Sequence, residues 1–312
     1  MSVLDSRVNV SLDWFSRRTE DMLFAKMIPG YNGGGNSWVN QGSMKNTGVE
    51  LTVNAFPVRN NDLTWESILT AAFVKNEILD MAGEDDILTD SYSDIGGAMQ
   101  IRKVGYPVGT FFVYQWEGFD DTGCNLYRKA DGSLTTLPEG DDRVVRGQSN
   151  PKWTIGWNNT INWKNWTANI FIYGATGFDR LDMTRFVNAS MFGTGRFFTL
   201  REAYFEGWDK VTNKANAKYS SFTNGNNRTF ANSTFWLEDA SFLKVKNVSI
   251  AYRVPRSVLK YLDAQVGLSV QNLCTFTKYK GIDPEPYNAG SGLDRGAYPV
   301  PRTFTLDLKF NF

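Results

Sequence analysis

The chain has 312 residues, its 33 acidic and 33 basic side chains balance, and it contains no histidine. The even charge lacks the basic footprint of a nucleic-acid-binding domain, and the absence of histidine removes the commonest general base and the commonest metal ligand. The two cysteines, Cys124 and Cys274, are far apart in the chain, so they indicate neither a disulfide framework nor a CxxC pair.

Aromatic residues make up 14% of the chain, with ten Trp and 22 Phe. No apolar run reaches the roughly 18 residues that a membrane helix needs. The N-terminus, MSVLDSRVNVSLDW, shows no charged-then-apolar signal region and begins at once with strand-like alternation. We therefore expect the chain to be the later part of something longer.

Alternation of apolar and polar residues predicts eight strands, because a period of two places successive side chains on opposite faces of a strand. In chain order the predicted strands are 6–16, 49–55, 63–73, 153–163, 166–172, 240–253, 264–270 and 303–312. The third strand has one polar residue, Ser67, in its apolar row. In the sixth strand the apolar row changes parity between Val245 and Val248, which a bulge near Lys246 would reconcile.

The last predicted strand, TFTLDLKFNF at 303–312, alternates without exception. Its apolar row consists of Phe304, Leu306, Leu308, Phe310 and Phe312. Such a strand either lies on a soluble core or faces lipid with its polar row toward a barrel lumen. Its length matches the roughly 9–11 residues of a tilted membrane-spanning strand.

The connections between the predicted strands alternate in length. Those after the second, fourth and sixth strands are short, at 59–62, 164–165 and 254–262, whereas the other connections are long. We expect the longest, about 77–152 and 177–235, to be polar and irregular, with at most a local hairpin in the first. A soluble sandwich has no reason to place every long loop at one end, but outer-membrane barrels have short periplasmic turns and long extracellular loops.

Tryptophans flank one of the short turns. Trp163 and Trp166 stand on either side of Lys164 and Asn165. Membrane barrels carry aromatic girdles at this level, so we expect these two residues at the inner rim.

Five stretches carry a resemblance to a known family. The closest are LEDASFLKVKNVSIAYRVP at 237–255, YKGIDPE at 279–285 and YPVPRTFTLDLKFNF at 298–312, supported by NTGVELTVNAFPVRNNDLTW at 46–65 and NPKWTIGWNNTINWKNWTANIFIYGATG at 150–177. Together they resemble the C-terminal barrel region of SusC/RagA-type TonB-linked (TonB-dependent) outer-membrane proteins. The resemblance runs over nearly the whole chain in the right order.

The resemblance implies an all-β fold, namely an antiparallel transmembrane β-barrel portion of about eight spanning strands from a larger, 22-stranded barrel with a plugged lumen. It implies residence in the outer membrane and import of a bulky nutrient, often a glycan or a peptide. It also implies a SusD-like lipoprotein lid on the outer mouth and a TonB contact made by an N-terminal part. Residues 1–312 would then be the C-terminal part, without the plug, the N-terminal extension or the signal peptide.

In outer-membrane barrels a C-terminal aromatic on an alternating strand resembles the signal read by the barrel-assembly machinery. Physically, an extended segment adds to an exposed sheet edge through main-chain hydrogen bonds, and its alternate side chains give specificity. We expect Phe312 and the rest of its row to be this signal. The alternative is that Phe312 only closes the lipid-facing girdle, and both interpretations can hold together.

Little in the chain indicates catalysis or cofactor binding. No GxSxG, HExxH, P-loop or GxGxxG motif occurs, and we expect neither an enzyme nor a cofactor. An acidic group could offer oxygen ligands to Ca²⁺, but its spacing does not match a DxDxDG calcium loop, so a solvated loop is favoured. The group comprises Asp80, Glu84, Asp85, Asp86, Asp90 and Asp94.

Aromatic residues in the long connections could stack on sugar faces, but burial within a packed loop is an equal alternative. They are Tyr204, Phe205, Trp208 and Trp236. The sequence therefore assigns no substrate-binding residue.

Two other interpretations of the whole chain remain open. A small autonomous eight-stranded barrel, acting as an adhesin or a structural protein, predicts pairing between 6–16 and 303–312, since eight strands can close around a side-chain-filled interior. A soluble carbohydrate-binding sandwich predicts a second sheet packed on the apolar row of 303–312. The one-sided loop lengths speak against the sandwich.

Overall fold

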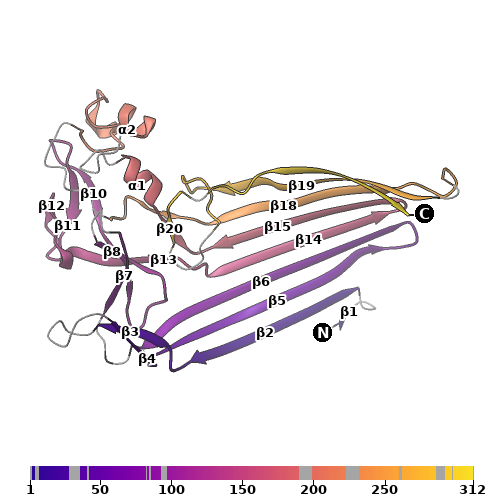
Figure 1. Cartoon of the computed structure of the whole chain (residues 1–312), viewed down its shortest axis with the longest axis horizontal. Helices are drawn as coiled ribbons and strands as arrows, with labels where there is room; N and C mark the ends of the chain where they lie inside the picture. The colour runs from indigo at the N-terminus through magenta and orange to yellow at the C-terminus, as the bar shows by residue number, and fades with distance from the viewer. Residues whose placement is uncertain are drawn as a thin grey trace.

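A sheet of long antiparallel strands runs most of the length of the molecule (Figure 1). The computed structural model describes residues 2–3, 7–27, 36–40, 42–81, 83, 86–92, 97–189, 199–222, 232–259, 262–285, 292–296 and 298–311. Within them the sheet order is β1 (Ser2–Val3), β2 (Val8–Thr19), β5 (Ser43–Arg59), β6 (Leu63–Asp80), β14 (Trp153–Trp163), β15 (Trp166–Thr176), β18 (Phe242–Arg253), β19 (Asp263–Thr277) and β21 (Thr303–Asn311). Each segment predicted from alternation forms one of the long strands.

Several strands are longer than their apolar alternation. The prediction for β5 was 49–55, yet pairing with β6 continues through Lys45 opposite Glu77 and Asn46 opposite Asn76. Main-chain hydrogen bonds do not depend on side-chain polarity, so the ladder extends beyond the apolar stretch into polar residues.

Short turns join the strands at the end of the sheet where both termini lie (Figure 1). Between β5 and β6 the Asn60 side chain accepts the backbone N–H groups of Asp62 and Leu63 at 3.0 and 2.7 Å, as in an Asx turn. Between β14 and β15, Lys164 has a φ of 51°, the left-handed conformation that two-residue hairpins need. The long connections lie at the opposite end, so the predicted alternation of short turns and long loops is confirmed.

The sheet is open at β2 and β21. In the described residues β2 pairs with β1 and β5, and β21 pairs with β19. No pair joins β2 to β21 in this part of the chain. The contact that an autonomous eight-stranded barrel predicts is therefore not formed there.

The long loops form a second region beyond the outer end of the sheet (Figure 1). Its strands are β3 (Leu23–Met27), β4 (Asn36–Asn40), β7 (Ile87–Tyr92), β8 (Gly97–Arg102), β9 (Thr110–Tyr114), β10 (Trp116–Phe119), β11 (Asn125–Arg128), β12 (Leu134–Thr135), β13 (Arg143–Gln148), β16 (Asp179–Asp182), β17 (Leu237–Asp239) and β20 (Leu293–Asp294). The helices are α1 (Met183–Ala189) and α2 (Arg201–Phe205), with single turns η2 (Gly140–Asp142) and η3 (Lys214–Asn216). No helix in the described residues is long and apolar enough to cross a membrane.

The expectation of irregular loops is wrong for most of this region. Met99, Phe111, Leu181, Phe186 and Trp236 belong to one buried core. These residues come from distant parts of the sequence, so no single window shows the periodicity that would predict the core. The main buried core of the chain therefore lies in the loops rather than under the sheet.

The bulge expected in the sixth predicted strand is confirmed. Phe171 on β15 lies opposite Asn247, while Ile172 lies opposite Val245, so Lys246 is left without a ladder partner. One extra residue shifts the parity of β18. The bulge therefore keeps the apolar residues on both sides of it on one face of the sheet.

Candidate functional site

The apolar row of the last strand is exposed. Phe304, Leu306, Leu308 and Phe310 are 71, 61, 57 and 50% exposed, and Phe312 lies outside the described residues. A strand on a soluble core would bury such side chains, because each gains about 1.5–3 kcal/mol when removed from water. In the described chain no second sheet packs on this row, which contradicts the sandwich interpretation.

The exposed row continues in register toward the turn end of the sheet. Leu308 lies opposite Val266, Val266 opposite Tyr252, Tyr252 opposite Trp166, and Trp166 opposite Trp163. The rings of Trp166 and Tyr252 are 4.6 Å apart. These aromatics form the row nearest the short turns, where the inner girdle was predicted.

A second aromatic row crosses the sheet near the loops. Trp14, Val49, Phe73 and Trp153 lie opposite one another on β2, β5, β6 and β14, and the rings of Phe73 and Trp153 are 4.9 Å apart. The strand between the two aromatic rows, β14, has 11 residues. At about 3.3 Å per residue and a tilt of about 40° it covers roughly 25 Å, the height of the apolar band of a membrane barrel.

In the described strands, polar residues interrupt this band at one place. Ser67 and Asn159 have the parity of the apolar rows on β6 and β14. Asn159 accepts the indole N–H of Trp65 at 3.1 Å, and Ser67 accepts that of Trp157 at 2.9 Å. The two polar side chains thus satisfy two tryptophan donors that would otherwise meet only hydrocarbon.

On the opposite, polar face, the bulge holds a returning segment. Lys244 donates to Asp283 and Glu285 at 2.6 and 2.8 Å, and Lys246 donates to both oxygens of Glu285 at 2.6 Å. Although burial works to raise it, the two ammonium groups hold the pKa of Glu285 below its ordinary value. The stretches KVK and DPE, which contributed to the resemblance, therefore contact each other directly.

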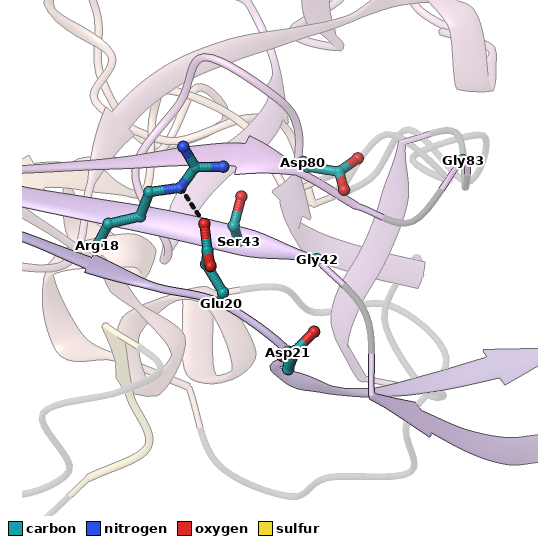
Figure 2. Close-up of a pocket in the computed structure, with 7 residues that line it drawn as sticks. All are labelled: Arg18, Glu20, Asp21, Gly42, Ser43, Asp80 and Gly83. Atoms are coloured by element: carbon teal, nitrogen blue, oxygen red, sulfur yellow. Dashed lines mark ion pairs between the residues drawn. The ribbon is translucent and has the colours of Figure 1, made fainter.

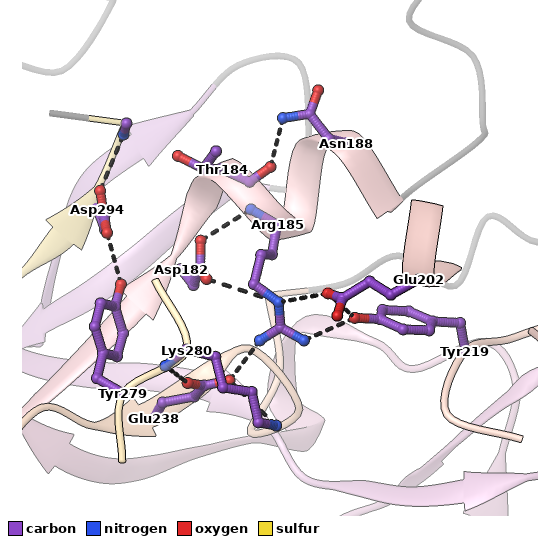
Figure 3. Close-up of polar contacts among 11 residues, drawn as sticks. Asp182, Thr184, Arg185, Asn188, Glu202, Tyr219, Glu238, Tyr279, Lys280 and Asp294 are labelled. Carbon is purple, nitrogen blue, oxygen red and sulfur yellow. Dashed lines mark hydrogen bonds and ion pairs between the residues drawn. The ribbon is translucent and has the colours of Figure 1, made fainter. Parts of the chain in front are cut away.

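A charged network centred on Arg185 ties the loop region together (Figure 3). Its guanidinium donates to Glu238 at 2.5 Å, Tyr219 at 2.8 Å and Glu202 at 3.3 Å. Burial raises the pKa of Tyr219 to about 12, and the hydrogen bond that its hydroxyl donates to the Glu202 carboxylate acts in the same direction. Asp182 accepts the backbone N–H of Arg185 at 2.9 Å, and burial raises the pKa of its carboxyl to about 6. The network joins β16, β17, α1 and α2.

A polar hollow of about 400 Å³ lies at the outer ends of β2, β5 and β6 (Figure 2). Arg18 and Glu20 form an ion pair of 2.9 Å at its rim, and Asp80 also lines it. The Ser43 hydroxyl is buried there without a hydrogen-bond partner among the described residues.

The acidic group considered for Ca²⁺ is only partly described. Glu84, Asp85 and Asp94 lie outside the described residues, as does the side chain of Asp90, whereas Asp86 forms an ion pair with Lys103. No set of three or more His, Cys, Asp or Glu in the described part of the chain could hold a metal ion.

The four loop aromatics fall into two environments. Trp236 is 2% exposed within the loop core, and Trp208 packs against Phe119 with ring centroids 6.1 Å apart. Tyr204 and Phe205, at the end of α2, are exposed. Sequence alone could not separate these cases, because burial here depends on contacts between distant segments.

Comparison with known proteins gives relatives along the whole chain. No protein-family model matches. The chain is 28% identical to TonB-dependent receptor P3 of Formosa agariphila over 100% of its own length and 33% of the relative. It is 27% identical to TonB-dependent receptor SusC of Bacteroides thetaiotaomicron over 99% of its length and 30% of that protein.

A solved structure of the RagAB peptide importer in the closed-closed state is similar with a TM-score of 0.83 at 25% identity, covering 98% of the chain and 34% of that structure. The exposed rows and the one-sided loops are those of an outer-membrane β-barrel wall, and along its whole length the chain is similar to TonB-dependent receptors. The similar proteins include receptors of the SusC/RagA type. The chain spans about a third of the length of the curated relatives that it matches.

Proposed function

We propose that the chain supplies barrel wall and extracellular loops to a SusC/RagA-like TonB-dependent nutrient importer, as its C-terminal part. The observation that carries the proposal is the exposed apolar row, which continues in register across the sheet of a chain similar to such receptors along its whole length. In the complete protein a glycan or a peptide crosses the lumen after a plug rearranges. The wall supports this passage without catalysis.

The two open edges of the sheet support a larger barrel. β2 and β21 each leave main-chain donors and acceptors without a neighbouring strand of comparable length in the described residues. In hydrocarbon an unpaired main-chain group costs several kcal/mol, and an open edge invites aggregation. Further strands, up to the 22 of the plugged transporters, would pair these edges.

Three partners follow from this proposal. A SusD-like lipoprotein covers the outer mouth, as the resemblance to SusC/RagA-type proteins implies, and the similarity of the fold to the RagAB importer supports this partner. TonB acts through a part outside this chain. The barrel-assembly machinery reads the row Phe304, Leu306, Leu308, Phe310 and Phe312, and the open edge of β21 supports this role because edge recognition needs unpaired main-chain groups.

Disulfide trapping distinguishes the larger barrel from an autonomous eight-stranded one. With Cys124 and Cys274 changed to Ser, the variant Ser11→Cys/Asp307→Cys places thiols on β2 and β21. The larger barrel predicts no disulfide between them, whereas Ser11→Cys/Thr52→Cys, at directly opposite positions on β2 and β5, should form one as a positive control. A β2–β21 disulfide in membrane-inserted protein would overturn the proposal.

Conductance offers a second test. The purified 312-residue chain, refolded alone, should aggregate through its edges and give no channel current. Reproducible currents from it would contradict the proposal, and an in-frame upstream coding sequence for a plug would support it.

A further inference from the structure

A cavity of about 480 Å³ opens at the outer end of the wall, where β14 and β15 meet the loop region. Its lining includes Tyr106, Lys152, Thr176, Asp179 and Asp239, which come from distant parts of the sequence. This volume lies within the roughly 300–1,000 Å³ of small-molecule sites. The wall function described above does not use it.

The cavity reaches the membrane-facing side of the sheet. Thr176 lies directly opposite Trp153 of the outer aromatic row, and alternation along β15 gives it the parity of Ile170 and Ile172. Its hydroxyl lies 2.9 Å from that of Ser241, which also lines the cavity. Aromatic rows mark the membrane–water interface, so the cavity lies at the depth of lipid headgroups.

Two carboxylates face each other in this cavity. Asp179 and Asp239 lie directly opposite in the β16–β17 pair, an arrangement that like charges make unfavourable. Burial raises the pKa of the Asp179 carboxyl, and the nearby Asp239 charge acts in the same direction. Gly147, with a φ of 70°, allows the main chain to approach Asp179, because a Cβ at this position would collide with the carboxylate. Asp239 accepts from the backbone N–H and hydroxyl of Ser241 through Oδ1, and Asp179 accepts from the backbone N–H of Gln148 through Oδ2. The second oxygen of each carboxylate is the acceptor that a ligand with several donors would satisfy.

The carboxylates, the ammonium group and the hydroxyls that line the cavity favour some classes of ligand over others. A phosphate would be repelled by Asp179 and Asp239, and a simple cation would lie close to Lys152. Sugar hydroxyls suit all of these groups, because each hydroxyl can donate to a carboxylate and accept from an ammonium or another hydroxyl. The half-exposed ring of Tyr106 offers an apolar face for the sugar ring.

We propose that this cavity binds the sugar headgroup of a glycolipid in the outer leaflet of the outer membrane. The acyl chains of such a lipid would lie along the apolar row below Trp153. The proposal requires only that this face of the sheet contacts lipid, and it is independent of which nutrient the complete protein imports.

Lipid analysis of the protein extracted from outer membranes in a mild detergent tests the proposal. Mass spectrometry should find a sugar-bearing lipid that remains with the wild type, reduced at least tenfold in Asp179→Asn/Asp239→Asn. The matched control Asp121→Asn/Asp141→Asn removes the same charge at two exposed loop positions and should retain the lipid. Thr176→Ala, which removes one hydroxyl without changing the charge, should lower retention about threefold.

Near-UV circular dichroism of each variant separates loss of binding from loss of fold. An unchanged lipid content in folded Asp179→Asn/Asp239→Asn and Thr176→Ala protein would overturn the proposal. So would displacement of the lipid by a free oligosaccharide such as maltohexaose at equal concentration, because the cavity would then be a nutrient site.

Discussion

Ser67 and Asn159 lie directly opposite each other on neighbouring strands, at mid-depth in the row that faces the membrane. Each is the polar exception in the part of its strand that lies between the two aromatic rows, and each accepts the indole N–H of a tryptophan from the other strand. Neither polar residue would be stable alone in hydrocarbon, and neither would the tryptophan donors. The four side chains therefore form one unit, and this unit also favours a single register between β6 and β14.

Removing one of these four side chains should lower the stability of the sheet, because its hydrogen-bond partner is left unsatisfied. Asn159→Ala leaves the Trp65 indole N–H without its acceptor, and we expect a loss of about 1–3 kcal/mol in unfolding free energy. Urea unfolding in lipid vesicles measures it. In the Trp65→Phe background the same substitution should cost clearly less, since the donor is already gone. Equal costs in both backgrounds would show that the hydrogen bond contributes nothing.

The two faces of β21 should respond differently to a carboxylate. Leu306→Asp places a charge on the membrane-facing row and should cost somewhat less than the about 2–4 kcal/mol that Arg or Lys costs near mid-depth, whereas Thr305→Asp on the polar face should be tolerated. Insertion into the outer membrane, followed by heat-modifiable electrophoretic mobility, measures the difference. If both variants insert equally well, the row does not face lipid.

The Lys244–Lys246–Glu285 contact should be sensitive to acid. The pKa of Glu285 in the folded protein lies below its ordinary value of 4.5. The stabilisation is therefore complete above pH 4.5 and is lost as the pH falls through the lower folded value. Hydrogen exchange in 279–285 should be slow and constant from pH 7 to 5, after correction for the intrinsic rate, and accelerate in stronger acid.

The variant Glu285→Gln serves as the control for this titration. It should exchange faster than the wild type above pH 4.5, show no acid-dependent step, and converge with the wild type in stronger acid. A wild-type segment whose corrected exchange changes between pH 7 and 5 would assign the titration to another group.

Arg185 should be a weak point of the loop region. Arg185→Met leaves the largely buried Tyr219 without its cationic donor and leaves Glu238 with only the longer, 3.6 Å ion pair to Lys280. Breaking a buried pair in this way costs about 3–5 kcal/mol, and we expect somewhat less here because Glu202 is half-exposed. Limited proteolysis should cut the loops of this variant first. Lys218→Met, which removes an exposed pair with Glu206, should leave the proteolysis pattern unchanged.

The strands could be predicted because each carries its own signal. Val8 to Trp14 or Phe304 to Phe310 alternate within one short window, and lipid on one side with water on the other imposes that period directly. The bulge at Lys246 was visible for the same reason, as a change of phase between Val245 and Val248.

The loop region and the polar interruption could not be predicted in this way. Phe111 and Trp236 share a core although they are far apart in the chain, so the signal lies in contacts rather than in a period. Ser67 looked like an isolated exception until the register placed Asn159 opposite it. The cavity above Trp153 likewise exists only where separate segments converge.

The location of the main buried core in the loops has a consequence for handling this protein. The loops exclude water with their own side chains, whereas the exposed apolar rows of the wall strands depend on the surrounding surfactant or lipid to cover them. The two halves should therefore fail under different treatments. A harsh surfactant would unfold the wall strands and leave the loops folded. A chaotrope added to the protein in a lipid bilayer would unfold the loops and leave the wall strands intact.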